Sequence, residues 1–122
     1  MQLVRIDHVQ LAMPAGQEER AREFYAGLLG LPEVAKPASL AASGGAWFEN
    51  AEVHVHLGVD PDFQPAKKAH PAFRVRDLGA WKQRLREAGV DLKPDDRLPG
   101  FARFFASDPF GNRLEFLESV SD

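Results

Sequence analysis

The chain has 122 residues, 44% of them hydrophobic and 27% charged, values that suit one folded domain and exclude a disordered or fibrous chain. Its formal net charge is −3 and its Lys and Arg residues are scattered, which excludes the basic surface typical of proteins that bind nucleic acid or an acidic membrane. The absence of cysteine excludes disulfides, thiolate metal sites and a cysteine nucleophile. We therefore expect small-molecule or protein partners.

The first half of the sequence predicts one strand, one helix and three further strands. Alternating apolar residues predict a strand over 3–13, and apolar residues at helical spacing predict a helix over 17–29. The segment 32–45 contains one short predicted strand, 46–50 is another, and 52–59 is the clearest strand of this half. The start of the chain has no basic segment followed by an apolar run, and no stretch is long enough to span a membrane, so we expect a cytoplasmic protein.

After a loop over 60–68 the same order of elements begins again. A strand is predicted over 69–76, an amphipathic helix over 78–88, and strands over 101–107 and 112–118. Asp108-Pro109-Phe110-Gly111 lies between the last two strands, with Pro and Gly at the positions that favour a type I turn.

The two halves are predicted to be two copies of one β-α-β-β-β unit. His8 recurs as His70 62 residues later, and His56 and Glu115 are 59 residues apart. Module one covers about residues 1–59 and module two about 69–119, within a single domain over 1–122. The helices should cover the apolar faces of the strands.

Alternation along the strands places four metal-ligating residues on the faces that the helices leave uncovered. They are His8, His56, His70 and Glu115. A solvated polar face is the simpler interpretation of each of them alone. Four such residues at equivalent places in two copies favour a divalent metal site instead, because three imidazoles and one carboxylate suit Zn, Ni, Co, Mn or Fe(II). His54 shares a face with His56 and is the alternative fourth ligand.

These residues resemble those of the vicinal oxygen chelate superfamily, which contains glyoxalase I, bleomycin resistance proteins, fosfomycin-resistance proteins and extradiol dioxygenases. The resemblance covers nearly the whole chain. It rests on the strand that begins His8-Val9-Gln10-Leu11, on Phe24-Tyr25 and Leu29-Gly30-Leu31, on the His70 strand, and most specifically on Asp108-Pro109-Phe110-Gly111-Asn112-Arg113-Leu114-Glu115. It implies an α+β fold in which two modules form a curved mixed sheet, an open barrel or cup with helices outside, often in a homodimer.

The resemblance also implies the roles of the four residues. His8, His70 and Glu115 resemble the two-histidine, one-carboxylate ligand set of the extradiol dioxygenases and fosfomycin-modifying enzymes. His56 stands where glyoxalase I enzymes normally place a glutamate, so metal binding is expected to survive but a standard glyoxalase activity is in doubt. Gln10 stands where fosfomycin-modifying enzymes tend to carry threonine, which counts against that branch.

Three functions remain open. The first is a lactoylglutathione lyase-like lyase or isomerase that holds an enediolate on the metal, with Glu115 as ligand and base. The second is an Fe(II) extradiol-type dioxygenase using His8, His70 and Glu115. The third is a non-catalytic protein that binds a bleomycin-like drug. The candidates for contacting the substrate are Arg103, Arg74, Gln10, Trp47, Phe101 and Phe105. The alternative for Arg103 is a place on the surface, and aromatic residues in strands more often belong to the core.

Overall fold

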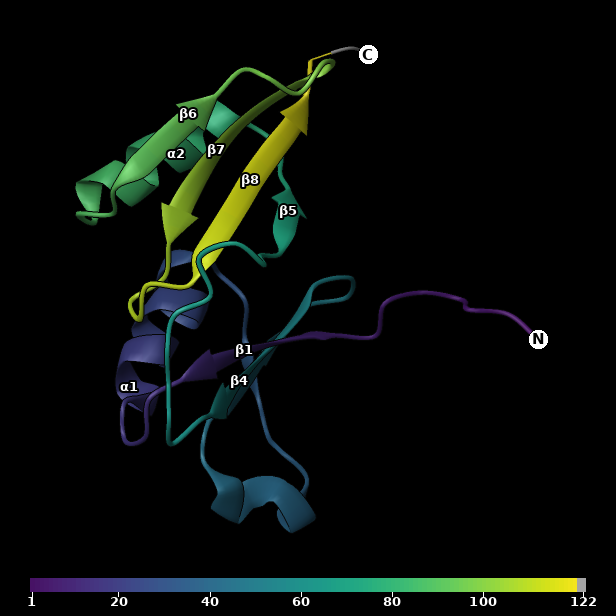
Figure 1. Cartoon of the computed structure of the whole chain (residues 1–122), viewed down its shortest axis with the longest axis vertical. Coiled ribbons are helices and arrows are strands. Elements are labelled where there is room, and N and C mark those ends of the chain that lie inside the picture. The colour runs from purple at the N-terminus through teal and green to yellow at the C-terminus, as the bar shows by residue number, and fades with distance from the viewer. Residues whose placement is uncertain (121–122) are drawn as a thin grey trace. The chain divides into compact units, whose positions relative to one another are not determined.

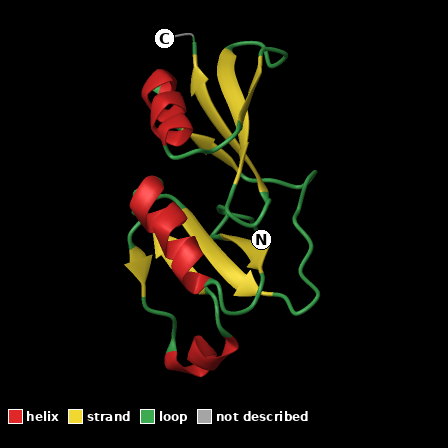
Figure 2. Cartoon of the chain, turned by 90° about the vertical axis from the view of Figure 1, so that its left-hand side faces the viewer, coloured by secondary structure: helices red, strands yellow, loops and turns green. Residues whose placement is uncertain are grey.

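A computed structural model of the chain describes residues 1–120. It divides into two compact units, residues 1–64 and 65–122, called module one and module two below. Each module has its own four-stranded mixed sheet with a helix against one face (Figures 1 and 2). The predicted α+β class with two β-α-β-β-β modules is confirmed. Among the described residues, no helix has the length and apolarity needed to span a membrane.

Module one has the sheet order β1-β4-β3-β2, in which β1 and β4 run parallel. Helix α1 continues directly into a π-helical segment, η1, and a short 3₁₀-helix, η2, precedes β3. The bounds are β1 (Val9–Met13), α1 (Glu18–Ala21), η1 (Arg22–Leu28), β2 (Glu33–Val34), η2 (Ala38–Ser43), β3 (Ala46–Glu49) and β4 (His54–Val59). Tyr25 of η1 stacks on Phe48 of β3 at 5.6 Å between ring centroids, so the helix covers the face that alternation predicts to be apolar.

Module two repeats this arrangement with the order β5-β8-β7-β6, in which β5 and β8 run parallel. The bounds are β5 (Ala72–Arg74), α2 (Leu78–Glu87), β6 (Leu92–Asp95), β7 (Phe101–Ser107) and β8 (Arg113–Ser119). Phe116 of β8 is buried beside Phe104 and Trp81, at centroid distances of 5.1 and 5.9 Å. Helix α2 therefore packs on the face opposite Glu115, as the alternation predicts.

Several local features differ from the sequence-based expectations. The strand predicted over 69–76 is formed only over Ala72–Arg74, the three residues that pair with β8. The predicted strand over 3–13 is paired only over Val9–Met13, because β4 begins at His54 and the ladder starts with Val9 opposite Val55. Strand β6 was not predicted individually, because its sequence contains Pro94 and shows no apolar alternation. Pro is tolerated there because β6 lies at the edge of the sheet. The 3₁₀-helix η2 was also unexpected.

Candidate metal centre

The turn before β8 is built by two buried polar side chains. Oδ1 of Asp108 accepts the backbone N–H groups of Phe110 and Asn112, both at 2.9 Å, and Oδ2 accepts Nδ2 of Asn112 at 3.0 Å. The backbone N–H of Gly111 donates to the carbonyl of Asp108 at 3.1 Å, which confirms the predicted turn. Asp108 and Asn112 are buried because the backbone needs them as local hydrogen-bond partners.

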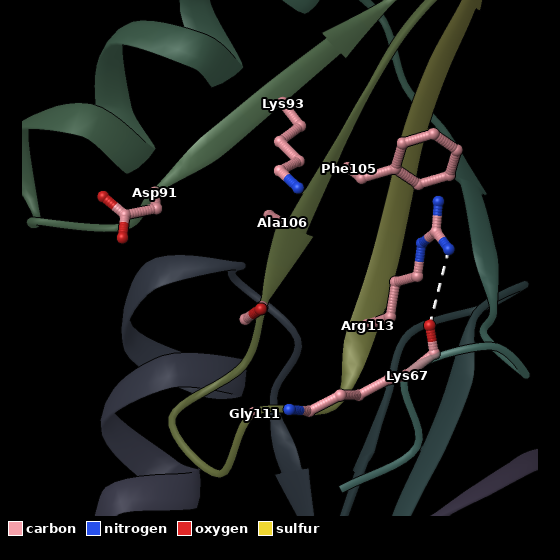
Figure 3. Close-up of a pocket in the computed structure, with 8 residues that line it drawn as sticks. Lys67, Asp91, Lys93, Phe105, Ala106, Gly111 and Arg113 are labelled. Carbon is pink, nitrogen blue, oxygen red and sulfur yellow. Dashed lines mark hydrogen bonds between the residues drawn. The ribbon is translucent and has the colours of Figure 1, made fainter.

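The same turn attaches β8 to the segment that precedes β5. Oδ1 of Asn112 accepts the N–H of Ala66 at 3.0 Å, and the N–H of Arg113 donates to the carbonyl of Ala66 at 2.8 Å. Gly111 has φ +91° and a Cβ there would lie 3.2 Å from Cβ of Pro65, so the turn requires glycine. Arg113 follows at the start of β8, as Figure 3 shows, and alternation puts Glu115 on the same face of the strand.

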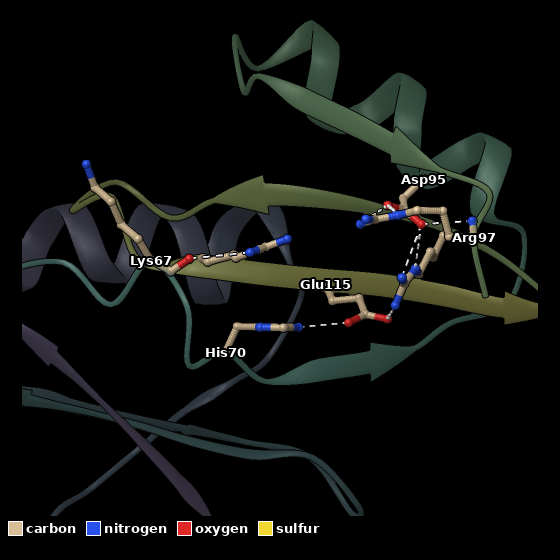
Figure 4. A network of polar contacts seen from close by, with 7 residues as sticks. Lys67, His70, Asp95, Arg97 and Glu115 are labelled. Carbon is tan, nitrogen blue, oxygen red and sulfur yellow. Dashed lines mark hydrogen bonds and ion pairs between the residues drawn. The ribbon is translucent and has the colours of Figure 1, made fainter.

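His70 and Glu115 form a direct contact in module two (Figure 4). Nε2 of His70 lies 2.8 Å from Oε1 of Glu115, and Nδ1 of His70 lies 2.8 Å from the backbone carbonyl of Lys68. A carbonyl only accepts, so Nδ1 carries a hydrogen, and Nε2 is the ring nitrogen that faces the carboxylate. Such a pair requires a proton or a cation between the two atoms.

The other carboxylate oxygen of Glu115 belongs to an ionic chain. Oε2 of Glu115 accepts Nη1 of Arg103 at 3.2 Å, and Arg103 also donates through Nε and Nη2 to Oδ1 of Asp95, at 3.2 and 3.1 Å. Arg97 donates to Asp95 in turn, at 2.7 Å from its Nε. These contacts with Arg97 and then Arg103 hold the pKa of Asp95 below its ordinary value. Glu115 is only 5% exposed, so its solvation is replaced by these contacts rather than by bulk water.

His8 in module one, like His70, has a hydrogen-bond acceptor at Nδ1. Its Nδ1 lies 3.0 Å from Oδ2 of Asp7, while no residue between 1 and 120 hydrogen-bonds to its Nε2. Histidines that bind metals usually donate the second ring N–H to a carboxylate or a backbone carbonyl, which fixes the tautomer. His8 and His70 both have such an acceptor at Nδ1, which makes Nε2 the candidate ligand atom of each ring.

His56 is enclosed between two aromatic rings. It is 4% exposed and stacks on Trp47 at 3.9 Å and on His8 at 4.3 Å between centroids. Its Nε2 lies 2.7 Å from Oε2 of Glu49, a partner that the sequence analysis did not single out. The signal was present, because Glu49 alternates with Trp47 on β3. In this rotamer the His56 and His8 rings stack in nearly parallel planes, 19° apart, so their lone pairs do not converge on one point.

His54, the alternative fourth ligand, is engaged by the backbone. Its Nδ1 lies 2.9 Å from the carbonyl of Asp7 and its Nε2 lies 3.1 Å from the carbonyl of Asn50. Both ring nitrogens are therefore occupied by hydrogen-bond acceptors, and His56 is the better candidate of the two.

The structure brings the four predicted ligands together as pairs. His8 contacts His56 in module one, and His70 contacts Glu115 in module two. Within residues 1–120, no group of three or more His, Cys, Asp or Glu side chains is placed to hold a metal ion. Two ligands at right angles and ~2.1 Å from one ion lie roughly 3.0 Å apart. The separation of 2.8 Å between Nε2 of His70 and Oε1 of Glu115 is close to this value and is also that of a direct hydrogen bond.

The residues predicted to contact substrate have the following surroundings. The guanidinium of Arg74 lies 5.0 Å from the ring centroid of Phe101, and the Gln10 side chain lies against Gly58. Trp47 stacks on His56, and the Phe105 ring meets the His70 ring edge-on at 5.5 Å. Arg103 is held by two carboxylates. Trp47 and Phe105 are thus the aromatic walls next to the two pairs.

Comparison with known proteins identifies the family. The family model described as the Glyoxalase/Bleomycin resistance protein/Dioxygenase superfamily matches residues 5–116, so the chain belongs to this superfamily. A search of curated protein sequences finds no match.

Solved structures agree with this assignment. A glyoxalase family protein from Bacillus anthracis is 45% identical, with a TM-score of 0.94 and 98% of each chain covered. The fosfomycin resistance protein FosX from Listeria monocytogenes shares the fold at 15% identity, with a TM-score of 0.79, 98% of this chain and 97% of that chain covered. A glyoxalase/dioxygenase from Nostoc punctiforme shares it at 21% identity, with a TM-score of 0.72 and coverage of 92% and 90%.

Proposed function

We propose that the protein is a metal-dependent enzyme of the glyoxalase-like group, a lyase or isomerase that removes a proton next to a substrate carbonyl. The proposed ligands are His8, His56, His70 and Glu115. A divalent cation bound there would act as a Lewis acid that stabilises negative charge on two neighbouring substrate oxygens. Zn, Ni, Co, Mn and Fe(II) all suit this ligand set.

The orientation of His70 toward Glu115 is the observation that carries this proposal. The carbonyl of Lys68 takes the Nδ1 hydrogen, which leaves Nε2 directed at a buried carboxylate 2.8 Å away. His8 likewise has an acceptor at Nδ1, the carboxylate of Asp7 in place of the carbonyl. A histidine with only a structural role has no need of this arrangement twice, at equivalent places.

The residues around Glu115 would prepare it for proton transfer. Arg103 donates to Oε2 and so fixes the carboxylate plane, while Phe105 lies against His70 and limits access of water. Glu115 is the proposed base, because proton removal requires a carboxylate close to the reacting carbon.

Two of the proposed ligands come from each module, so one ion bound by all four would require both pairs. We propose that the protein forms a homodimer, in which the pairs come either from one chain or from two copies. Light scattering of the purified protein measures the oligomeric state directly.

An Fe(II) dioxygenase is the second candidate, and the contact of His56 with Glu49 favours it. If Nε2 of His56 stays 2.7 Å from Glu49, only His8, His70 and Glu115 remain as ligands. Two histidines and one carboxylate with open positions are typical of non-haem Fe(II) oxygenases.

Metal analysis combined with activity assays separates the candidates. Protein purified without added metal is analysed for bound metals and assayed with methylglyoxal and glutathione and with a panel of catechols. Nickel or zinc with activity on the first pair supports the lyase, and iron with ring cleavage supports the dioxygenase. If the protein binds none of the divalent metals when each is supplied, both enzymatic candidates are refuted. Non-catalytic binding of a small molecule would then be the remaining function.

A further inference from the structure

Module two contains a hollow on the same face of its sheet as Glu115. It has a volume of about 290 Å³ and is lined by residues of β6, β7 and β8 and of the segment before β5 (Figure 3). Lys93 pairs with Phe105, and Phe105 pairs with Glu115, so the three residues lie side by side across the sheet. The hollow therefore adjoins the His70–Glu115 pair.

The hollow is lined by more cationic than anionic side chains. Its lining includes three cationic side chains, Lys67, Lys93 and Arg113, and one carboxylate, Asp91. Within residues 1–120 none of these four side chains forms an ion pair. A surplus of positive charge thus faces the hollow, although the chain as a whole has a formal net charge of −3.

Arg113 is held in place by contacts that leave its charge free. Its guanidinium carbon lies 4.0 Å from the ring centroid of Phe105, which is buried, and its Nη1 makes one long hydrogen bond of 3.4 Å to the carbonyl of Lys67. A guanidinium has five N–H donors, so most of them remain available. Arg103 near the same ring is different, because Asp95 and Glu115 already bind it.

We propose that Arg113, Lys93 and Lys67 bind a small anionic group, a phosphate or a carboxylate. A planar guanidinium that is already oriented binds such groups through two parallel hydrogen bonds, and the two ammonium groups add point charges. The volume suits one substituent of a ligand rather than a whole drug-sized molecule. The idea that this anion is part of the substrate of the metal site rests on the proposed function. Anion binding by these three residues does not depend on it.

A titration of metal-free protein tests this site. Two-dimensional ¹H–¹⁵N NMR spectra are recorded with increasing inorganic phosphate and, separately, acetate, at constant ionic strength in buffer stripped of metals by a chelating resin. We expect saturable shifts of the amides of Lys93, Ser107 and Gly111, and the anion with the higher affinity identifies the preferred group. Arg113→Gln should weaken binding by about tenfold.

Arg86→Gln is the matched control, since Arg86 is exposed on α2 and the change in net charge is the same. It should change the affinity by less than about twofold. Lys93→Gln provides a second test of the site if Arg113→Gln does not fold. Absence of saturable shifts with both anions, or equal weakening by Arg113→Gln and Arg86→Gln, would overturn the proposal. Because no metal is present, failure of the metal site leaves this result unaffected.

Discussion

His56 and Glu115 occupy the same register position in the two modules. His56 lies opposite Gln10 of β1 and Trp47 of β3, and Glu115 lies opposite Ala72 of β5 and Phe105 of β7. Gln10 follows His8 by two residues, as Ala72 follows His70. The two pairs are therefore related by the internal repeat, although one module supplies an imidazole where the other supplies a carboxylate.

This relationship predicts the effect of placing a carboxylate in module one. His56→Glu would put a second carboxylate next to Glu49, whose Oε2 lies 2.7 Å from Nε2 of His56. We expect a loss of about 3 kcal/mol in the free energy of unfolding, because the buried site would hold two like charges. Urea denaturation measures it. The double variant His56→Glu/Glu49→Gln should recover more than half of the loss, and no recovery would show that Glu49 is not the cause.

The turn before β8 predicts a large effect at a residue that does not touch the metal ligands. Asp108→Ala removes the acceptor of three hydrogen bonds from buried donors, so we expect a loss of about 3 kcal/mol in unfolding free energy. Asp60→Ala is the control, because Asp60 is exposed and accepts one backbone N–H at 2.9 Å. It should lose less than about 1 kcal/mol by the same measurement. Equal losses would contradict the structural role of Asp108.

Glycine at position 111 provides a second test of this turn. Gly111→Ala combines a positive φ with a Cβ contact of 3.2 Å to Pro65, whereas Gly16→Ala has a similar φ of +78° and no atom within 4 Å. Gly16→Ala should cost about 1–2 kcal/mol from the backbone conformation alone. Gly111→Ala should lose more in thermal unfolding, and a smaller loss than at Gly16 would show that Pro65 does not constrain the turn.

The ionic chain through Arg103 predicts a pH dependence of stability. Arg97 and then Arg103 lower the pKa of Asp95 in the folded protein, so the unfolded chain binds the proton more readily. This contribution is present above the unfolded pKa of about 4 and is lost as the pH falls below it. The free energy of unfolding, measured from pH 7 to pH 3, should therefore decline less steeply in Asp95→Asn than in the wild type. Parallel curves of unfolding free energy against pH would show that Asp95 does not contribute to this pH dependence.

The sequence predicted the fold well where alternation and helical spacing are strong. Strands β4, β7 and β8 and helix α2 lie within two residues of their predicted bounds. Strand β6 escaped prediction, because Lys93, Pro94 and Asp95 have neither apolar alternation nor β propensity. The segment before β1 alternates like a strand but has no partner in the described ladder, and pairing cannot be read from one segment alone.

The candidate site was predicted in its residues more than in its contacts. Alternation placed His8, His56, His70 and Glu115 on the uncovered faces, but it gave no sign that His56 and Glu115 would be buried. His56 contacts Glu49 on a neighbouring strand. Glu115 accepts a hydrogen bond from Arg103, which also donates to Asp95. Such contacts depend on strand register and on side-chain rotamers, neither of which a single sequence determines.

The metal content of ligand variants tests the central claim most directly. Wild type, His70→Ala, Glu115→Gln and the control His54→Ala are supplied with the metal that the wild type prefers, desalted and analysed by mass spectrometry of metals. We predict about one ion per chain in the wild type and in His54→Ala, and at least about a hundredfold weaker binding in the other two. Unchanged metal content in Glu115→Gln, or a wild type that binds no metal, would contradict the proposed metal site.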